Sequence, residues 1–448
     1  MGIKLEGGYL LAVIGAGPAG LYAAGKLAGA GGTVLILNRD IRPGGLAEYG
    51  IYYKKHKMKE GLRKQFRKIL ETPRIAYFGN VTVGEQGDFT LDGIKAMGFS
   101  AVLVTVGAQA TKWLGLPGEH LTGVYHAKDI VYHYNKLPPF SQTRLRIGKK
   151  VALIGVGNVM VDIARWLCRE KKVDDVIVVA RRGPAEVKFT KKEFSHVAAY
   201  LDKPAFAQEF ERVQERMLAV GQNPQEAKGF ILSIPPEAPE AGKQPRLRFA
   251  FLSSPKRILG DGQGNVCGLE VEDTRLVCEG ERTKPKGMGT TRVLDVDTVV
   301  FCIGDKADRA IGLPVEWNGF CKNPNPLYPV HGVSYEAYDP ESGKPIEGVF
   351  IAGWARNASK GLVGLARKDG EAGAEAVLRY LQTLPPMAEP ETKFEEIARR
   401  IRALPHPVAD KDAVFALEAA EKAEAERRGA DYFRFDTNEA MLRAAGLL

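Results

Sequence analysis

The sequence predicts an α/β protein with two strand–helix–strand units, each built around a glycine-rich turn. In the first unit, apolar residues 9–14 precede the turn and an alanine-rich stretch with helical spacing, and a second apolar run spans residues 33–37. The same order recurs over residues 151–180. Further apolar runs with the pattern of buried strands end at Gly107, Gly304 and Gly353. Alternating strands and helices indicate parallel sheets, so we expect an α/β fold.

The first turn has the spacing G-x-G-x-x-G, with Gly15, Gly17 and Gly20 at the glycine positions and Pro18 and Ala19 before the last. In such a turn the first glycine permits a tight bend, the second lets the backbone approach a pyrophosphate, and the third lets the helix pack on its strand. The helix N-terminus then presents unpaired N–H groups to the phosphates. The alternative is a glycine-rich turn without a ligand. Two copies in the strand–turn–helix context favour two Rossmann-like dinucleotide-binding domains.

The second turn contains Gly155 and Gly157 but has Met160 at the third position. A methionine is tolerable there if the helix lies slightly farther from its strand. Arg181 and Arg182 follow the second strand, where an NAD site would carry an acid. Guanidinium groups suit a 2′-phosphate, so this unit favours NADP, although a solvated arginine pair is the simpler alternative.

The first unit departs from the usual pattern at Asn38. An FAD site generally ends this strand with an acid that accepts from the ribose hydroxyls, whereas Asn38 offers only a neutral amide oxygen. We expect FAD to bind here, with a weaker bond at the ribose.

The composition is that of a globular protein with more than one domain. A chain of 448 residues, of which 45% are hydrophobic, exceeds what one core usually holds.

The five cysteines form no C-x-x-C pair, which argues against a metal site or an iron–sulfur cluster and fits a reducing cytoplasm. We expect neither a targeting signal nor a membrane span, because the apolar residues 9–25 hold a glycine turn and fall short of the ~20 residues a span needs. The net charge of +9 favours an anionic partner.

The motifs, taken in order along the chain, resemble one family. After the first turn come residues 43–46 (PGGL) and 49–51 (YGI), and after the second come residues 181–184 (RRGP), 189–193 (FTKKE), 247–249 (LRF), 353–354 (GW) and 439–443 (EAMLR). This series resembles the adrenodoxin-reductase type of ferredoxin–NADP(+) reductase, an FAD-dependent pyridine nucleotide oxidoreductase, over almost the full length. The glutamate synthase small subunit is more distant, because its cysteine-rich N-terminal domain is absent.

The resemblance implies a glutathione-reductase-like fold, in which an NADP domain is inserted into a discontinuous FAD domain. We expect FAD-binding parts at residues 1–107 and 329–384, the NADP-binding domain at 108–328, and a helical C-terminal extension at 385–448. The implied activity is electron transfer between NADP(H) and a ferredoxin-type iron–sulfur protein through hydride transfer to flavin N5. The implied partner is an acidic ferredoxin or an iron–sulfur subunit.

The resemblance also assigns site residues. The residues expected to act beside the flavin are His56, Asp162 and Trp354. The residues expected near FAD or the nicotinamide, besides the first turn and Asn38, are Gly45, Leu46, Val81, Gly107, Gly353, Gly361, Leu362 and Val363. The residues expected to hold NADP, besides the second turn and the arginine pair, are Asn158, Val159 and Glu193. One departure is Lys360, because the family carries Pro-Thr-Gly where this chain has residues 359–361 (SKG).

Two other functions stay open. The chain could be the flavin subunit of a larger complex such as a 2-oxoacid:acceptor oxidoreductase, or a flavin-binding scaffold without turnover, as Asn38 and Lys360 suggest. Nucleic acid is not expected as a partner, because the basic residues lack interleaved aromatic residues for stacking.

One helix is expected to carry a basic docking surface. The apolar residues at helical spacing, expected to face the core, are Met58, Leu62, Phe66, Ile69 and Leu70. The basic residues expected to project are Lys59, Arg63, Lys64, Arg67 and Lys68, preceded by Lys54, Lys55 and Lys57. A solvated face is the simpler alternative, but opposite charges would steer an acidic ferredoxin to this helix.

Overall fold

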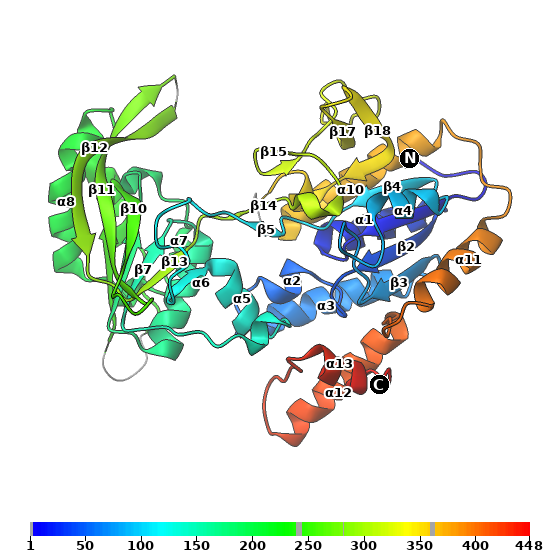
Figure 1. The fold of residues 1–448 in the computed structure, drawn as a ribbon, viewed down its shortest axis with the longest axis horizontal. Helices are drawn as coiled ribbons and strands as arrows, with labels where there is room; N and C mark the ends of the chain where they lie inside the picture. Colours follow the sequence, from blue (N-terminus) through cyan, green and yellow to red (C-terminus); the bar gives the residue numbers. More distant parts are fainter. Residues whose placement is uncertain (1–2, 239–243, 281, 359–362) are drawn as a thin grey trace. The chain divides into compact units, whose positions relative to one another are not determined.

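The computed structural model describes residues 3–238, 244–280, 282–358 and 363–448. The chain forms two compact units. The first comprises Met1–Ala110, Tyr132–Gln142 and Asp305–Leu448, and the second comprises Thr111–Val131 and Thr143–Gly304. Each unit contains a sheet of mainly or wholly parallel strands with helices, as Figure 1 shows, so the predicted α/β class is confirmed. Residues 108–110, 132–142 and 305–328 group with the first unit, although we expected them in the NADP-binding domain.

The sheet of the first unit has six strands in the order β17-β18-β4-β1-β2-β3. Their bounds are β1 Leu10–Ile14, β2 Thr33–Asn38, β3 Ile75–Gly79, β4 Ala101–Val104, β17 Glu336–Asp339 and β18 Lys344–Ile351. Neighbouring strands pair in parallel except β17, which pairs with β18 in the antiparallel direction. The carboxyl ends of β1, β2, β4 and β18 therefore meet at one edge of the sheet.

Both faces of this sheet are buried, which explains why its strands are continuously apolar. In β1, Leu11 and Val13 join a core with helices α1, α3 and α10, whereas Leu10 and Ala12 join a second core with α4 and α11. The helices of this unit are α1 Pro18–Gly29, α2 Leu46–Tyr49, α3 His56–Leu70, α4 Leu91–Ala96, α10 Val363–Leu381, α11 Pro390–Arg402, α12 Lys411–Arg427 and α13 Asn438–Ala444. The C-terminal extension expected to be helical at residues 385–448 contains α11, α12 and α13.

The second unit contains a five-stranded parallel sheet in the order β6-β13-β7-β8-β9. The bounds are β6 Val124–His126, β7 Lys150–Ile154, β8 Asp175–Val179, β9 Arg246–Ala250 and β13 Thr298–Phe301. An antiparallel sheet of β10 Ser253–Gly260, β11 Val266–Glu279 and β12 Arg282–Leu294 shares a core with one face of the parallel sheet. The helices of this unit include α6 Asn158–Trp166, α7 Lys191–Phe194, α8 Lys203–Leu218 and α9 Pro224–Leu232. Helix α5 Ala127–Tyr134 follows β6.

No helix in the described part of the chain is both long and apolar enough to cross a membrane.

Candidate dinucleotide-binding sites

Two glycines of the first turn are required by the fold itself. Gly15 has φ +101°, and a Cβ there would lie 2.8 Å from the carbonyl oxygen of Thr105. A Cβ on Gly20 would lie 2.0 Å from the carbonyl oxygen of Gly15. The Thr105 hydroxyl closes the turn by donating to the carbonyls of Ile14 and Gly15 at 3.0 and 2.8 Å. Any side chain at position 15 or 20 would push α1 away from β1 and β4.

Gly17 is different, because no contact among the described residues requires a glycine there. Its φ of −73° and ψ of 178° suit any residue, and a Cβ would meet no described atom within 4 Å. Gly17 is the N-cap of α1, no side chain caps this helix, and its first turn has no acid. Side chains do cap other helices, such as Thr90 at α4 and Asp202 at α8. An open, uncapped helix N-terminus with a bare backbone fits a pyrophosphate.

Two more segments reach the same turn. The N–H of Gly44 donates to the carbonyl of Ala16 at 2.7 Å, and a Cβ on Gly45 would lie 3.0 Å from the Cα of Gly17. From the other side, a Cβ on Gly353, at the end of β18, would lie 2.6 Å from the Cβ of Ala19. The loop of residues 43–46 and the end of β18 therefore enclose the N-terminus of α1 at the carboxyl edge of the sheet, where α/β proteins bind ligands.

Asn38 is buried and fully engaged by the protein. Its amide oxygen accepts from the N–H of Ala16 at 2.9 Å, and its amide nitrogen donates to the carbonyls of Asp40 and Arg42 at 2.7 and 3.0 Å. The same nitrogen lies 3.1 Å from the Tyr77 hydroxyl. A carboxylate could not make the two donated bonds, so the loop after β2 explains why an amide stands where an acid is usual. A bond from Asn38 to a ribose stays a prediction.

The other residues expected around FAD have the following positions. Val81 is buried, and its N–H donates to the carbonyl of Asn38 at 3.0 Å. Gly107 follows β4 with φ +73°. Leu46 begins α2, Val363 begins α10, and Trp354 lies, partly buried, in the short 3-10 helix Gly353–Ala355. Gly361, Leu362 and Lys360 lie outside the described residues.

Asp369 helps to hold the turn at the carboxyl edge of the first unit's sheet, and the sequence did not predict this role. Asp369, on α10, accepts from the N–H of Gly353 at 2.6 Å and binds the guanidinium group of Arg356, with Nε at 3.2 Å. The Tyr335 hydroxyl also donates to Asp369 at 3.3 Å. Asp369 therefore fixes the turn that carries Trp354. No local pattern distinguishes it from the other charged residues at the start of α10.

The second turn repeats the first with one change. A Cβ on Gly155, which has φ +123°, would lie 2.4 Å from the carbonyl oxygen of Cys302, whereas a Cβ on Gly157 would meet no atom within 4 Å in the described part of the chain. Gly157 is the N-cap of α6, again without a side-chain cap or an acid in the first turn. Met160 is fully buried, so the helix and turn leave room for a long side chain. This turn also fits a pyrophosphate.

The residues expected around NADP surround this turn. The amide oxygen of Asn158 accepts from the N–H of Thr190 at 2.9 Å, which holds the loop before α7 beside the turn. Val159 is 45% exposed despite its apolar side chain, so its position in the first turn of α6 is available to a ligand. Glu193 lies on α7, with an oxygen 3.7 Å from the Nε2 of His196.

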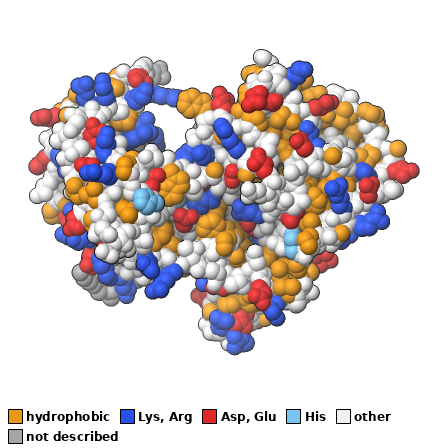
Figure 2. Space-filling model, viewed as in Figure 1, with side chains coloured by type: hydrophobic (Ala, Val, Ile, Leu, Met, Phe, Trp, Pro, Cys, Tyr) orange, Lys and Arg blue, Asp and Glu red, His pale blue; other side chains and the backbone are white. Residues whose placement is uncertain are grey.

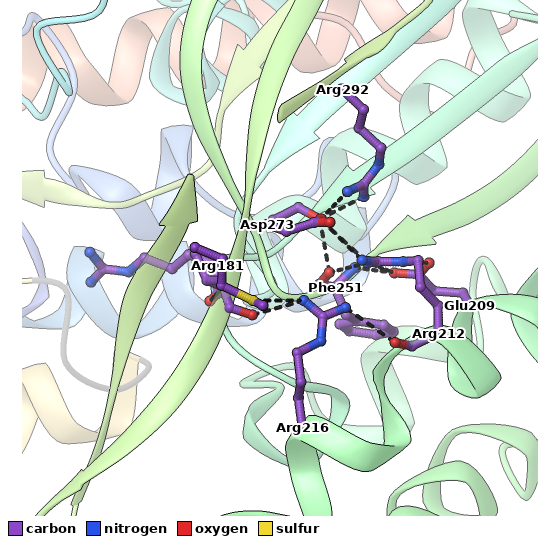
Figure 3. Close-up of polar contacts among 10 residues, drawn as sticks. Arg181, Glu209, Arg212, Arg216, Phe251, Asp273 and Arg292 are labelled. Carbon is purple, nitrogen blue, oxygen red and sulfur yellow. Dashed lines mark hydrogen bonds and ion pairs between the residues drawn. The ribbon is translucent and has the colours of Figure 1, made fainter. Parts of the chain in front are cut away.

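The two arginines after β8 differ: Arg182 forms an ion pair within the protein, whereas the side chain of Arg181 is exposed. Arg182 pairs with Glu186 at 3.4 Å. Arg181 is exposed, and its backbone carbonyl accepts from the Thr274 hydroxyl at 2.8 Å. Figure 3 shows the Arg181 side chain extending away from a cluster in which carboxylates neutralise other arginines. In that cluster Arg212 binds Glu209 at 2.7 Å and Asp273 at 3.1 Å, and Arg292 also binds Asp273.

His56 and Asp162 belong to different units. His56 is the first residue of α3, and Asp162 lies, partly buried, on α6. Burial lowers the pKa of His56, and the neighbouring Lys59 and Arg63 lower it further, so the imidazole is neutral near pH 7. That the two residues form a pair beside the flavin stays a prediction.

The predicted docking surface on α3 needs correction. Met58, expected to face the core, is 52% exposed, whereas Lys59 is 1% exposed and donates to the amide oxygen of Asn135. Arg63 donates to both oxygens of Glu48 at 2.8 and 2.9 Å, and Arg67 binds Glu418 of α12 at 2.7 Å. The prediction was wrong for Met58 and Lys59, and the charges of Arg63 and Arg67 are paired with carboxylates of α2 and α12. The other expected core residues, Leu62, Phe66, Ile69 and Leu70, do pack against the core. The basic residues here that are exposed are Lys54, Lys57, Lys64 and Lys68.

The fold and the two turns define a protein with two dinucleotide-binding units of related design. Residues 9–201 match the pyridine nucleotide-disulphide oxidoreductase family. The NADPH-ferredoxin reductase FprA of Mycobacterium tuberculosis is 27% identical over 97% of this chain and 98% of its own length. The mitochondrial NADPH:adrenodoxin oxidoreductase of Arabidopsis thaliana is 27% identical over 78% of each chain. A solved structure of M. tuberculosis FprA, a histidine-to-glutamine mutant, matches with a TM-score of 0.80 and 26% identity over 98% of this chain and 99% of its own.

The chain is therefore a homologue of FprA and of adrenodoxin reductase, and its residues 9–201 are similar to the pyridine nucleotide-disulphide oxidoreductases.

Proposed function

We propose that this chain is an FAD-dependent oxidoreductase that transfers electrons between NADP(H) and an iron–sulfur protein of the ferredoxin type. The observation that carries the proposal is the repeated open turn. Gly17 and Gly157 are the N-cap residues of helices that no side chain caps, and no contact with a described residue requires either glycine. Two such turns can hold the phosphates of two dinucleotides, and the relatives with similar sequences are named NADPH-ferredoxin reductase and NADPH:adrenodoxin oxidoreductase.

The first unit would hold FAD. Its pyrophosphate would lie over Gly17 and the N-terminus of α1, and Val81 would lie near the adenine. Trp354, held by the Gly353 turn and Asp369, would lie with Val363 near the flavin ring. When bound, FAD supplies the redox chemistry, taking a hydride at N5 and giving electrons to the acceptor.

The second unit would hold NADP(H). The open turn at Gly157 and the N-terminus of α6 would bind the pyrophosphate, and Asn158 would shape the neighbouring loop. Arg181, exposed and extended, would bind the 2′-phosphate, with Arg182 in a supporting position because Glu186 already engages it. Glu193 would lie on the ribose side.

His56 would accept a proton. Its neutral imidazole at pH 7 can accept one, since its pKa is held below the ordinary value by burial and by Lys59. Asp162 would be the second polar residue of this pair.

The acceptor would be an acidic iron–sulfur protein attracted to the exposed lysines of residues 54–68. Figure 2 shows Lys and Arg side chains interspersed with Asp and Glu on the visible face, so net charge alone selects no surface. Lys64 has 72% of its side chain exposed and is therefore a suitable probe. Lys64→Glu combined with Lys68→Glu should slow reduction of an acidic ferredoxin and weaken its salt dependence. Lys284→Glu, at an exposed lysine of β12, is the matched control.

The decisive experiment is anaerobic mixing of the FAD-loaded protein with NADPH or NADH, followed by a panel of ferredoxins. NADPH should bleach the flavin absorbance faster than NADH, and the reduced protein should then reduce an acidic ferredoxin. The Gly17→Ala protein, folded but without FAD, is the control that should reduce nothing. A flavin that NADPH leaves oxidised would overturn the proposal.

A further inference from the structure

The C-terminal segment after α11 is fastened to the first unit by a buried network of ions. Glu421 of α12 binds Arg42 and Arg434, the latter at 3.0 Å, and Arg434 also binds Glu48. All four side chains are at most 7% exposed. Burial would raise the pKa of Glu48, but Arg434 and Arg63 outweigh it and hold the pKa below its usual range. Because removing one partner would leave a buried charge unpaired, the segment is held in one position.

Tyr432 is presented by this segment to His56. The tyrosine and imidazole rings are stacked, with centroids 4.3 Å apart and an interplanar angle of 26°. The Tyr432 hydroxyl accepts from Arg434 at 2.6 Å and from Arg63 at 3.1 Å. Since both arginines are themselves bound to Glu48, the orientation of the tyrosine ring is set by the buried network.

The His56 imidazole depends on this stacking. Its Nδ1 is buried and has no hydrogen-bond partner among the described residues. The charged groups around it are Lys59 and Arg63 on α3 and Asp431 and Arg434 on the C-terminal segment, and only Asp431 raises its pKa. Stacking on Tyr432 is thus the contact that fixes the ring plane, and it also keeps water from one face of the ring.

We infer that Tyr432 is a positioning residue for His56, so that the C-terminal segment completes the site in the first unit. The stacking of Tyr432 on His56 is a property of the protein alone. Only the role of His56 in proton transfer rests on the proposed function. A residue 376 positions away in sequence then controls the orientation and solvent exposure of the imidazole.

The test uses the FAD-loaded protein with labelled histidines, and His56→Gln assigns the His56 signals. In the unchanged protein, the His56 ring protons should be shifted upfield by the Tyr432 ring. Tyr432→Leu should abolish this shift and raise the His56 pKa toward its ordinary value, because water reaches the ring. Tyr432→Phe should retain both properties. Phe433→Leu is the control, since Phe433 packs on Phe435 and Arg428 instead.

A His56 signal without the upfield shift in the unchanged protein would overturn the inference, whether or not any variant folds. So would a His56 titration that is the same in Tyr432→Leu and in the unchanged protein. The pH profile of flavin reduction by NADPH separates the two proposals. If the His56 pKa moves and the profile moves with it, both stand. If the pKa moves and the profile does not, the positioning stands and the proton role of His56 falls.

Discussion

The two glycine turns have the same backbone design, but the residues at the carboxyl ends of their second strands differ. Asn38, the last residue of β2, points inward, and its amide group forms hydrogen bonds with Ala16, Asp40 and Arg42. After β8, Arg181 turns outward into solvent. The first unit thus uses the last residue of this strand to hold its own loop, whereas the second unit leaves a cation available for an anion two residues beyond its strand. Corresponding strand ends in two units of related design can serve the fold in one unit and a ligand in the other.

The largest effect should come from the glycines that the fold requires. Gly20→Ala would place a methyl group 2.0 Å from the Gly15 carbonyl oxygen, which should destabilise the protein by about 3 kcal/mol or more. The methyl group of Gly17→Ala would meet no atom of the residues that the structure describes, so the free energy of unfolding should change by less than about 1 kcal/mol. Bound FAD should nevertheless be lost from Gly17→Ala. Urea unfolding of FAD-free protein and flavin content after purification measure the two effects. An unstable Gly17→Ala protein would show that the open position serves packing.

Asn38→Asp sharpens the contrast, because it restores the acid that is usual after this strand. The new carboxylate would face the carbonyls of Asp40 and Arg42, with two buried acceptors left without donors, and should cost about 2–3 kcal/mol. Repulsion would raise the pKa of the new carboxyl above its unfolded value. The folded state then binds more protons than the unfolded state, so the penalty should grow as pH rises above about 4. Urea unfolding at pH 5 and pH 8 tests this, and a variant as stable as the original at pH 8 would contradict it.

In the second unit, Arg181→Ala should weaken NADPH binding by about 10- to 100-fold, corresponding to about 1.5–3 kcal/mol for a charged hydrogen bond. NADH binding should change little, since it lacks the phosphate. Arg182→Ala should have a smaller effect because Glu186 already pairs with Arg182. Titration calorimetry with both nucleotides gives the comparison. Equal losses of NADPH and NADH affinity in Arg181→Ala would remove this residue from the phosphate site.

The sequence predicted the strands and the two turns correctly because there the local residue pattern directly reflects what the structure requires. The apolar runs predicted the strands because both faces of the sheets are buried, and the glycine spacing located both turns. In the helix at residues 56–70, Leu62, Phe66, Ile69 and Leu70 pack against the core as predicted, whereas Met58 is exposed and Lys59 is buried. Lys59 and Arg63 are held by Asn135 and Glu48, and Arg434 binds Glu48 across 386 positions. Such long-range contacts leave no periodic signal in the helix, and for the same reason Asp369 and Tyr432 were not foreseen.

The smallest expected effect concerns the protonation of Lys59, a buried lysine of the first unit. Burial lowers the pKa of Lys59 to about 7, with Glu48 opposing and Arg434 and Arg63 assisting the shift. Between pH 7 and its unfolded pKa near 10.5, the unfolded chain holds one proton more than the folded chain. Stability from this group should therefore rise with pH across that window, by up to about 1.4 kcal/mol per pH unit.

Lys59→Met removes the titrating group but keeps the apolar stem. It also leaves the Asn135 amide oxygen without its donor, a cost that is independent of pH. Free energies of unfolding by urea at pH 7, 8 and 9 should therefore rise less steeply with pH in the variant than in the original protein, whatever the offset between them. Lys64→Met, at an exposed position of the same helix, should leave the slope unchanged. Parallel curves for Lys59→Met and the original protein would mean that Lys59 stays charged in the interior. The buried network around Glu48 would then tolerate a third cation beside Arg63 and Arg434.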